Sequence, residues 1–329
     1  MRTRILPTFN PYYCSFYLHG IGDHGPMRYS TRDFEDLLPC TGDPVGLPPR
    51  ISYELASIID GRRIFIATSD HTAINERAVA WADVYGQVNL DPGESGRIVP
   101  VGPSFGVRSW GVAGTMAHFI RTYAKGKVTI GIRRHASLYR KQWHRAPLSA
   151  YIPQHSDSDY VFFAAWPWTR HPDVNPPRAR FIEACQSTPG LEFEGGFVPR
   201  WRHDHIPGLE GLAAPKRYSL TEYLEKVKRS AFVYNTPAVH QCLGWKLGEF
   251  LALGKAIISL PLTRRMPAPV EHGVHAHFVD GSDGSLRHAI EYLRGDLRYR
   301  KRLEDGAREY WEAHLTPARV IERLLAFAP

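Results

Sequence analysis

Residues 235–258 have the sequence NTPAVHQCLGWKLGEFLALGKAII. The apolar runs Ala231 to Asn235 and Ala256 to Leu260 each predict a buried strand. Between them lie a polar turn and a longer apolar stretch, Trp245 to Leu253, which favours a helix. This strand, turn, helix and strand are typical of an α/β sheet.

The turn and the start of this helix are expected to bind an anion. Gly244 lets a ligand approach the backbone closely, and the free N–H groups of a helix start attract a diphosphate. Lys246 adds a positive charge. Glu249 lies one turn further on among apolar neighbours, where its carboxylate suits vicinal hydroxyls such as those of ribose. The alternative interpretation is a solvated Glu on a surface helix.

The remainder of the chain repeats this alternation of short apolar and longer amphipathic runs. Strands are predicted at 4–9, 27–30, 63–68, 84–90, 98–101, 160–166, 191–197, 231–235, 256–260 and 277–280. Helices are predicted at 10–21, 51–59, 73–82, 110–124, 133–144, 177–185, 219–228 and 245–253, and from 286, 297 and 317. Residues 146–158 have the composition of a linker.

Composition indicates a folded chain with a large core. Its 329 residues are 43% hydrophobic, and they include 8 Trp, 16 Tyr and 15 Phe. No apolar run reaches the length of a membrane span, and Met1 to Asn10 lacks a signal-peptide core, so we expect a cytoplasmic protein. The four scattered cysteines predict neither a zinc site nor a disulfide framework.

Positive charge is concentrated in one segment. The formal net charge is +8, yet Ser95 to Ser156 contains ten Lys or Arg and no Asp or Glu. Residues 121–145 combine such cations with the apolar side chains Leu138, Tyr139 and Trp143. This pattern favours either a solvated basic helix or association with an anionic membrane or a phosphate-bearing lipid. Nucleic acid is disfavoured because no recognition-helix or zinc pattern is present.

Two short motifs suggest other functions. Gly20, Gly22 and Gly25 match G-x-G-x-x-G, but the residues that follow do not open a helix, so a dinucleotide site is not expected. Gly102 to Gly106 matches G-x-S-x-G after a strand, and three histidines lie downstream. A serine hydrolase using Ser104 is therefore an alternative, although Pro103 restricts the strained turn that such a nucleophile needs.

Residues 235–258 resemble the C-terminal half of GT-B glycosyltransferases, notably bacterial enzymes that use nucleotide-diphosphate sugars. In many retaining members two glutamates stand eight positions apart, the first contacting the sugar and the second the ribose. Glu249 matches the second and Gly244 an intervening glycine, whereas Gln241 stands at the first. Gln can hold a sugar hydroxyl but carries no charge, which leaves the sugar and the stereochemical course open.

The resemblance implies an α/β chain of GT-B type, with two Rossmann-like domains facing across a cleft and a C-terminal helix crossing back to the first domain. The acceptor domain would span residues 1–150 together with 312–329, and the donor domain 159–311. The motif Glu194-Gly-Gly-Phe197 looks like the turn whose backbone holds the base. The loop containing Trp168 and Arg170 would supply a cation to the diphosphate.

The implied donor-binding residues are Arg170, Gly196, Phe197, Asn235, Thr236, His240, Gln241, Gly244, Trp245, Lys246 and Glu249. Acceptor-side residues would be Asn10, Ser104, Phe105, Gly106 and Arg108. If the enzyme inverts, it needs a base in the first domain, and Asp70 and His71, with His118 behind them, are the candidates. The alternative for Asp70 is a cap of the helix expected near Thr72.

The implied reaction moves a sugar from a nucleotide diphosphate, for example a UDP-sugar, to an acceptor hydroxyl in polysaccharide, glycolipid or glycoconjugate synthesis. No metal or cofactor is expected beyond the nucleotide-sugar co-substrate, and Asp157-Ser-Asp159 is interpreted as a polar flanking run rather than a metal motif. The other alternative is a non-catalytic nucleotide- or polyanion-binding protein, with sugar transfer to DNA as a variant. Nucleotide, sugar, acceptor and oligomeric state are not specified by the sequence.

Overall fold

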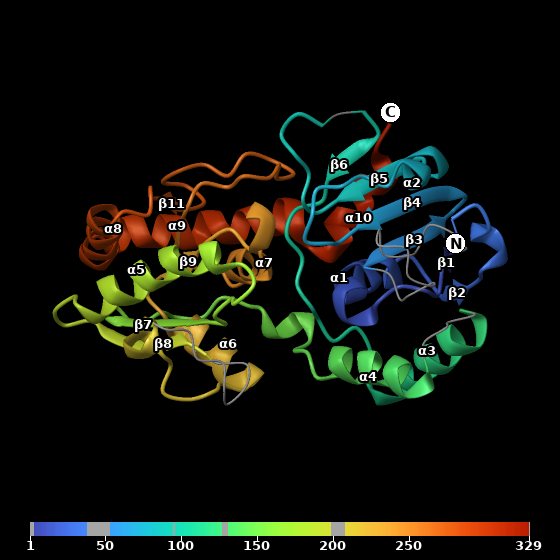
Figure 1. The fold of residues 1–329 in the computed structure, drawn as a ribbon. Helices are drawn as coiled ribbons and strands as arrows, with labels where there is room; N and C mark the ends of the chain where they lie inside the picture. Colours follow the sequence, from blue (N-terminus) through green and yellow to red (C-terminus); the bar gives the residue numbers. More distant parts are fainter. Residues whose placement is uncertain (1–2, 38–52, 95, 127–130, 199–207, 329) are drawn as a thin grey trace. The chain divides into compact units, whose positions relative to one another are not determined.

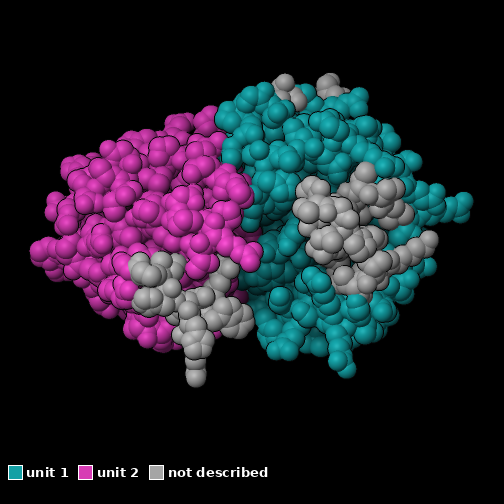
Figure 2. All heavy atoms as spheres, viewed as in Figure 1, with its two compact units in different colours: residues 1–150, 264–267, 313–329 teal, residues 151–263, 268–312 magenta. Residues whose placement is uncertain are grey.

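The computed structural model describes residues 3–37, 53–94, 96–126, 131–198 and 208–328 (Figure 1). The chain divides into two compact units (Figure 2). Unit 1 comprises Met1–Ala150, Arg264–Pro267 and Ala313–Pro329, and unit 2 comprises Tyr151–Thr263 and Ala268–Glu312. Each unit is described below by itself.

Unit 1 contains a six-stranded sheet whose strand order is β2-β1-β3-β4-β5-β6. The strands are β1 (Thr3–Ile5), β2 (Met27–Tyr29), β3 (Glu54–Ile59), β4 (Arg62–Ala67), β5 (Val84–Gln87) and β6 (Ile98–Pro100). All neighbouring pairs are parallel except those of β3, which is antiparallel to both β1 and β4. The carboxyl ends of β4 and β5 therefore meet at one edge of the sheet.

The helix predicted at 51–59 is wrong, because residues 54–59 form strand β3. Residues 51 and 52 lie outside the described residues. A two-residue turn, Asp60-Gly61, joins β3 to β4, and both residues have positive φ, 49° and 88°. Such an Asp-Gly pair matches the twist of a tight hairpin. The buried run 55–59 packs in the sheet, so tertiary pairing overrides the apparent helical periodicity.

Helices α1 (Pro11–Gly22) and α10 (Pro317–Ala326) pack against each other in unit 1 (Figure 1). Asn10 caps α1, as predicted, by accepting a hydrogen bond from the Tyr12 N–H at 3.0 Å. A Cβ on Gly20 would lie 2.3 Å from the carbonyl oxygen of Pro317. Gly20 is therefore required for close helix packing, which accounts for one glycine of the G-x-G-x-x-G match without a dinucleotide.

Three other helices complete the described part of unit 1: α2 (Glu76–Trp81), α3 (Val112–Lys125) and α4 (Ile132–Trp143). Short 3₁₀ turns lie at Arg32–Phe34 and Leu148–Ala150. Helix α3 packs on β2 and on α4, and α4 packs on α1. The Thr122 hydroxyl joins α3 to α4 through His135 Nε2 at 3.0 Å and the Tyr139 hydroxyl at 2.8 Å.

Unit 2 contains the strands β7 (Tyr160–Ala165), β8 (Glu192–Phe197), β9 (Val233–Asn235), β10 (Ile257–Ser259) and β11 (His277–Phe278). Strand β7 pairs in parallel with β8, and β10 pairs in parallel with both β9 and β11. The Ala231 N–H, just before β9, donates to the Tyr160 carbonyl at 2.8 Å. This bond puts β9 beside β7, so the strands follow the order β8-β7-β9-β10-β11.

The helices of unit 2 are α5 (Asn175–Gln186), α6 (Leu220–Arg229), α7 (Trp245–Ala252), α8 (Asp283–Gly295) and α9 (Leu297–Tyr310). Alternate residues of β7, including Val161 and Phe163, join the buried cluster formed with α5 and α8. Phe162 points to the other face, where its ring lies 4.9 Å from that of Tyr218. Residues 160–165 of the unalternating run thus form a strand covered on both faces, as predicted, whereas Trp166 lies outside the strand and is 52% exposed.

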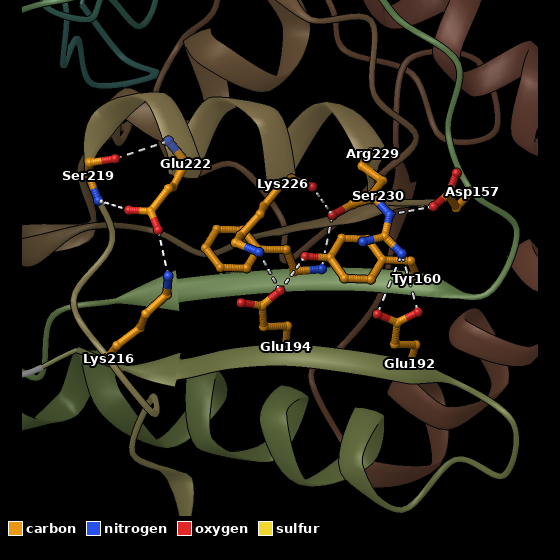
Figure 3. Close-up of polar contacts among 11 residues, drawn as sticks. Asp157, Tyr160, Glu192, Glu194, Lys216, Ser219, Glu222, Lys226, Arg229 and Ser230 are labelled. Atoms are coloured by element: carbon orange, nitrogen blue, oxygen red, sulfur yellow. Dashed lines mark hydrogen bonds and ion pairs between the residues drawn. The ribbon is translucent and has the colours of Figure 1, made fainter.

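Helix α6 begins with the predicted capping box of Ser219 and Glu222. Figure 3 shows how its next turns are tied to the strands: Glu194 of β8 accepts hydrogen bonds from Lys226 at 2.7 Å and from Tyr160 at 2.8 Å. Burial opposes the ionisation of Glu194, but these bonds outweigh it and lower the pKa of its carboxyl group. Glu194 therefore anchors α6 to the sheet.

Glu194–Phe197 is not the predicted turn, because these residues belong to β8. Base binding by Gly196 and Phe197 stays a prediction. Gly195 and Gly196 have φ of 117° and 128°. A Cβ on Gly195 would lie 1.9 Å from the Phe163 carbonyl oxygen, and one on Gly196 would lie 2.4 Å from that of Leu212. The two glycines therefore serve close backbone packing.

The fold consists of two α/β units with mainly parallel strands, and the C-terminal helix α10 belongs to unit 1. The predicted α/β class, the two units and the return of the C-terminal helix to the first unit are confirmed.

Candidate functional site

The candidate site lies in unit 2, where the strand order reverses. The chain passes from β7 to β8 on one side and then to β9 on the other side of β7. In open parallel sheets, ligands bind outside the carboxyl ends of the two strands at such a switch point. Here these ends are Ala165 of β7 and Asn235 of β9.

Arg178, in the second turn of α5, bridges the two strand ends. Its Nε donates to the Thr236 hydroxyl at 3.2 Å, and one terminal nitrogen lies 3.4 Å from the Trp166 carbonyl oxygen. The side chain is half-buried, and burial lowers the pKa of Arg178 to about 10. Its guanidinium group is thus held at the switch point as a cation.

Lys246, in the first turn of α7, is the second cation at these strand ends. Its Nζ donates to the Ala164 carbonyl and lies 4.6 Å from the centre of the Phe163 ring. Burial, and then repulsion from Arg178, lower the pKa of Lys246 to about 7. Among the described residues, neither Lys246 nor Arg178 has a carboxylate within 4.0 Å. The two cations are therefore suited to a bound anion.

The turn from β9 to α7 has a strained backbone. His240 and Gln241 both have positive φ, 55° and 59°, a conformation that non-glycine residues rarely adopt. The Ala238 N–H donates to the Cys242 carbonyl at 2.8 Å, and the Thr263 hydroxyl donates to the Gln241 carbonyl at 2.5 Å. These bonds close the turn, and both side chains are exposed. Strain of this kind clusters at ligand sites.

Glu249 is buried, with 5% of its surface exposed, so the interpretation as a solvated surface Glu is wrong. Its carboxylate accepts a hydrogen bond from the Tyr223 hydroxyl of α6 at 3.0 Å. It lies one turn after Lys246 on the same helix. Gly244 precedes that helix and supplies no side-chain cap. The start of α7, which has no side-chain cap, therefore combines a cation and a buried carboxylate.

The remaining predicted donor residues have different environments. The Asn235 amide donates to the Ser259 hydroxyl at 2.9 Å and is buried, so it joins β9 to β10. Trp245 is half-buried at the start of α7. Arg170 is exposed in the loop after β7. Phe197 is 3% exposed and belongs to the core of unit 2.

The loop after β7 is held by Asn175. Its amide oxygen accepts from the Trp168 N–H, and its amide nitrogen donates to the Trp168 carbonyl, both at 2.9 Å. The His171 ring in this loop lies 4.9 Å from the His240 ring, nearly perpendicular to it. The loops after β7 and β9 thus touch each other at the switch point.

In unit 1, Asp70 and His71 are exposed after the carboxyl end of β4. Two buried amides from the neighbouring strand and its extension hold their loop: Asn89 donates to the Ser69 carbonyl at 2.8 Å and Gln87 to the Thr72 carbonyl at 3.0 Å. The alternative role of Asp70 as a helix cap is wrong, because α2 begins at Glu76 and Asn75 is its cap.

His118 does not lie behind Asp70 and His71. Its Nδ1 is 2.7 Å from the Tyr29 hydroxyl of β2, and its ring stacks on Trp110 at 4.1 Å. Strand β2 is at one edge of the sheet, three strands away from β4. Burial lowers the pKa of His118 to about 4, so it is neutral near pH 7.

The predicted acceptor-side residues make the following contacts within unit 1, and their role in acceptor binding stays a prediction. Asn10 caps α1, and Phe105 is fully buried against Phe16, with ring centres 5.4 Å apart. The Gly106 carbonyl accepts from the Arg145 side chain at 3.1 Å. The Arg108 N–H donates to the Ala146 carbonyl at 2.9 Å.

A nucleophile elbow at Ser104 is not formed. Such an elbow places the serine on a sharp turn that leads directly into a helix. Here residues 101–109 have no regular secondary structure, and α3 begins only at Val112. Ser104 is 5% exposed. The serine hydrolase alternative is therefore not supported.

The described residues contain no group of three or more His, Cys, Asp or Glu side chains arranged to hold a metal ion. In the Asp157-Ser-Asp159 run, Asp157 pairs with Arg229, and Asp159 pairs with Arg294 at 2.7 Å. Within the same described ranges, no helix combines the length and apolar character of a membrane span.

Sequence reasoning missed Arg178, Asn175 and Tyr223. Arg178 lies in a helix whose periodicity does not indicate that the side chain reaches back to the strand ends. Tyr223 comes from α6 and meets Glu249 only through tertiary packing.

No family model matches the sequence, and no curated protein matches it. Similar solved structures include a glycosyltransferase from Rickettsia africae ESF-5, with 10% identity, coverage of 80% of this chain and 68% of that chain, and a TM-score of 0.47. Anabaena Alr3699/HepE in complex with UDP has 11% identity, coverage of 75% and 72%, and a TM-score of 0.42. WaaG, a glycosyltransferase involved in lipopolysaccharide biosynthesis, has 12% identity, coverage of 92% and 98%, and a TM-score of 0.37.

Proposed function

We propose that this chain is a glycosyltransferase that moves a sugar from a nucleotide diphosphate to an acceptor hydroxyl. The observation that carries the proposal is the pair of cations, Arg178 and Lys246, held at the switch point of unit 2 without a carboxylate within 4.0 Å among the described residues. A diphosphate would neutralise both. It would also relieve the repulsion through which Arg178 contributes to the low pKa of Lys246.

Other residues of the same site would bind the rest of the donor. Glu249 would accept hydrogen bonds from ribose hydroxyls, exchanging or sharing its bond from Tyr223. The N–H groups at the start of α7, which Gly244 leaves without a side-chain cap, would face the diphosphate. Gln241, exposed on its strained turn, would hold a sugar hydroxyl.

During transfer, the bond between the anomeric carbon and the diphosphate oxygen breaks, and its electron pair stays on the diphosphate. The acceptor oxygen forms the new bond and loses its proton. Arg178 and Lys246 would stabilise the charge that develops on the leaving diphosphate, which is commonly the largest catalytic contribution. This assigns charge neutralisation to side chains, and we therefore expect activity to persist in the presence of EDTA.

In an inverting reaction, Asp70 would take the acceptor proton, with His71 beside it. Asp70 is exposed at the carboxyl end of β4 and does not cap a helix. Replacing Asp70 with Asn should lower kcat by about 100-fold or more while the Kd of the donor changes little. Equal and mild changes in both quantities would remove Asp70 from this role.

The experiment that tests the proposal is a thermal-shift screen against UDP, GDP, ADP and TDP with their sugars, followed by hydrolysis of the stabilising donor. We expect one nucleotide to stabilise the wild type and to have little effect on a variant with Arg178→Met and Lys246→Met. Absence of nucleotide-dependent stabilisation would contradict the proposal. Stabilisation without any turnover across acceptors would favour the non-catalytic nucleotide-binding alternative.

A further inference from the structure

Helix α3 presents a row of large apolar side chains to solvent. Val112, Met116, Ile120 and Tyr123 are 67%, 56%, 56% and 38% exposed. Their spacing of four, four and three residues puts them on one face of the helix. Ile132, at the start of α4, is 51% exposed. We call the four α3 residues the apolar stripe.

The stripe is fixed in its outward orientation by the opposite side of α3. There, Thr122 is fully buried and bonded to His135 and Tyr139 of α4. His118 on the same inner side is bonded to Tyr29 of β2. A rotation that buried the stripe would break these bonds, so the apolar face stays available to a partner.

The sequence predicted that Leu138, Tyr139 and Trp143 of α4 supply the apolar side chains of a membrane-binding surface. The structure corrects this. Tyr139 is 2% exposed and faces α3, while Leu138 and Trp143 are half-buried. The outward side of α4 carries cations instead: Arg133, Arg134, Arg140 and Lys141 are all exposed. We call these four residues the basic face.

The charges around the stripe have one sign. Arg121 and Lys125 are exposed on α3 beside the stripe. Among the described residues, neither they nor any residue of the basic face has an ion-pair partner. No Asp or Glu occurs from Ser95 to Ser156. This surface therefore joins exposed aliphatic side chains to unneutralised cations. It is formed by the two packed helices α3 and α4 (Figure 1).

We propose that the α3–α4 surface docks on an anionic lipid bilayer. The apolar stripe would enter the interface between headgroups and acyl chains, and the basic face with Arg121 and Lys125 would contact lipid phosphates. Two other occupants fit less well. A second copy of this surface would bring like charges together, and a nucleic acid would leave aliphatic Val, Met and Ile side chains without a partner. The proposal is independent of the transferase proposal.

Flotation of the full chain with vesicles tests this inference. Vesicles of phosphatidylcholine alone are compared with vesicles that also contain phosphatidylglycerol. One variant combines Met116→Glu with Ile120→Glu, and a second combines Arg133→Ser with Arg134→Ser. The matched control is Leu297→Glu, which changes an apolar side chain of α9 that is 54% exposed.

We expect the wild type and the control to bind anionic vesicles and to bind neutral ones at least about tenfold more weakly, since each cation near such a surface contributes about fivefold. Each α3 or α4 variant should reduce binding about tenfold or more, with an unchanged melting temperature because the substituted side chains are exposed. Equal binding to both kinds of vesicle, or unchanged binding of the Met116/Ile120 variant, overturns the proposal. The proposal is also overturned if the wild type binds duplex DNA but no vesicles, and if only the Arg133/Arg134 variant loses that DNA binding.

Discussion

Replacing Lys246 with Met tests two properties of the proposed cation site: the loss of folding stability caused by the buried cation, and the affinity for a nucleoside diphosphate that it provides. Burial and repulsion from Arg178 lower the pKa of Lys246 from 10.5 to about 7. Between these pH values the unfolded chain binds more protons than the folded chain, so the free energy of unfolding rises with pH. Lys246 therefore destabilises the folded protein most below about pH 7, and this cost disappears as pH approaches 10.5.

The size of the effect follows from the pKa change. The whole change corresponds to at most about 5 kcal/mol. Because water reaches part of the Lys246 side chain, we expect roughly half of it, about 2 kcal/mol. Lys246→Met should thus increase the free energy of unfolding by about 2 kcal/mol near pH 6, and by progressively less at higher pH. It should also weaken nucleoside-diphosphate binding at least about tenfold, because a charge-assisted hydrogen bond is lost.

Lys255 provides the matched control. It is 2% exposed, burial lowers its pKa to about 8, and its Nζ donates to the Lys228 carbonyl at 2.9 Å. Lys255→Met should alter the pH dependence of stability without changing nucleotide affinity. Urea denaturation across pH and calorimetric titration measure the two quantities. The reasoning is refuted if Lys246→Met lowers stability near pH 6, or if both variants weaken nucleotide binding equally.

Three further predictions concern ribose binding, helix packing and pH. Glu249→Ala should weaken ribonucleoside-diphosphate binding about tenfold or more and leave pyrophosphate binding unchanged, as competition titrations would measure; equal losses for both ligands would exclude ribose contact. Gly20→Ala should destabilise unit 1 by about 1–3 kcal/mol, because the new Cβ meets the Pro317 backbone. Gly22→Ala is the milder control, because its Cβ meets only the flexible end of Met27 at 3.4 Å. Similar melting curves for the two variants would contradict this prediction. Burial lowers the pKa of His135 from 6.5 to about 4. The free energy of unfolding should therefore fall by at most about 3 kcal/mol as pH drops from 6.5 to about 4, and it should depend less on pH in a His135→Gln variant. Urea denaturation at several pH values measures this, and the same pH dependence in the variant and the wild type would exclude His135 as the cause.

Features encoded by local chemistry could be predicted from the sequence. The Asn10 cap, the Ser219/Glu222 capping box and the buried strand 160–165 all form as expected. These signals depend on residues close together in the chain. The Asp60-Gly61 pair is an equally local signal for a hairpin, and it favours a strand rather than a helix before residue 60.

Features that depend on distant packing could not be predicted in this way. Glu194 was expected to belong to a turn, but it lies in strand β8 and accepts a hydrogen bond from Lys226 of α6. Arg178 reaches the strand ends because α5 packs beside β7, which periodicity alone does not indicate. Phe105 follows a strand, the position expected for an acceptor-side residue, yet it is fully buried.

The central claim is that Arg178 and Lys246 hold a diphosphate at the switch point of unit 2. Calorimetric titration at about pH 8, in two buffers of different protonation enthalpy, tests it directly with the best nucleoside diphosphate and its nucleoside. The diphosphate should bind at least about 100-fold more tightly, since two charge-assisted contacts are gained, and binding should take up a proton that Lys246→Met no longer takes up. Equal affinities for the two ligands, or binding of the diphosphate without proton uptake, would contradict the claim.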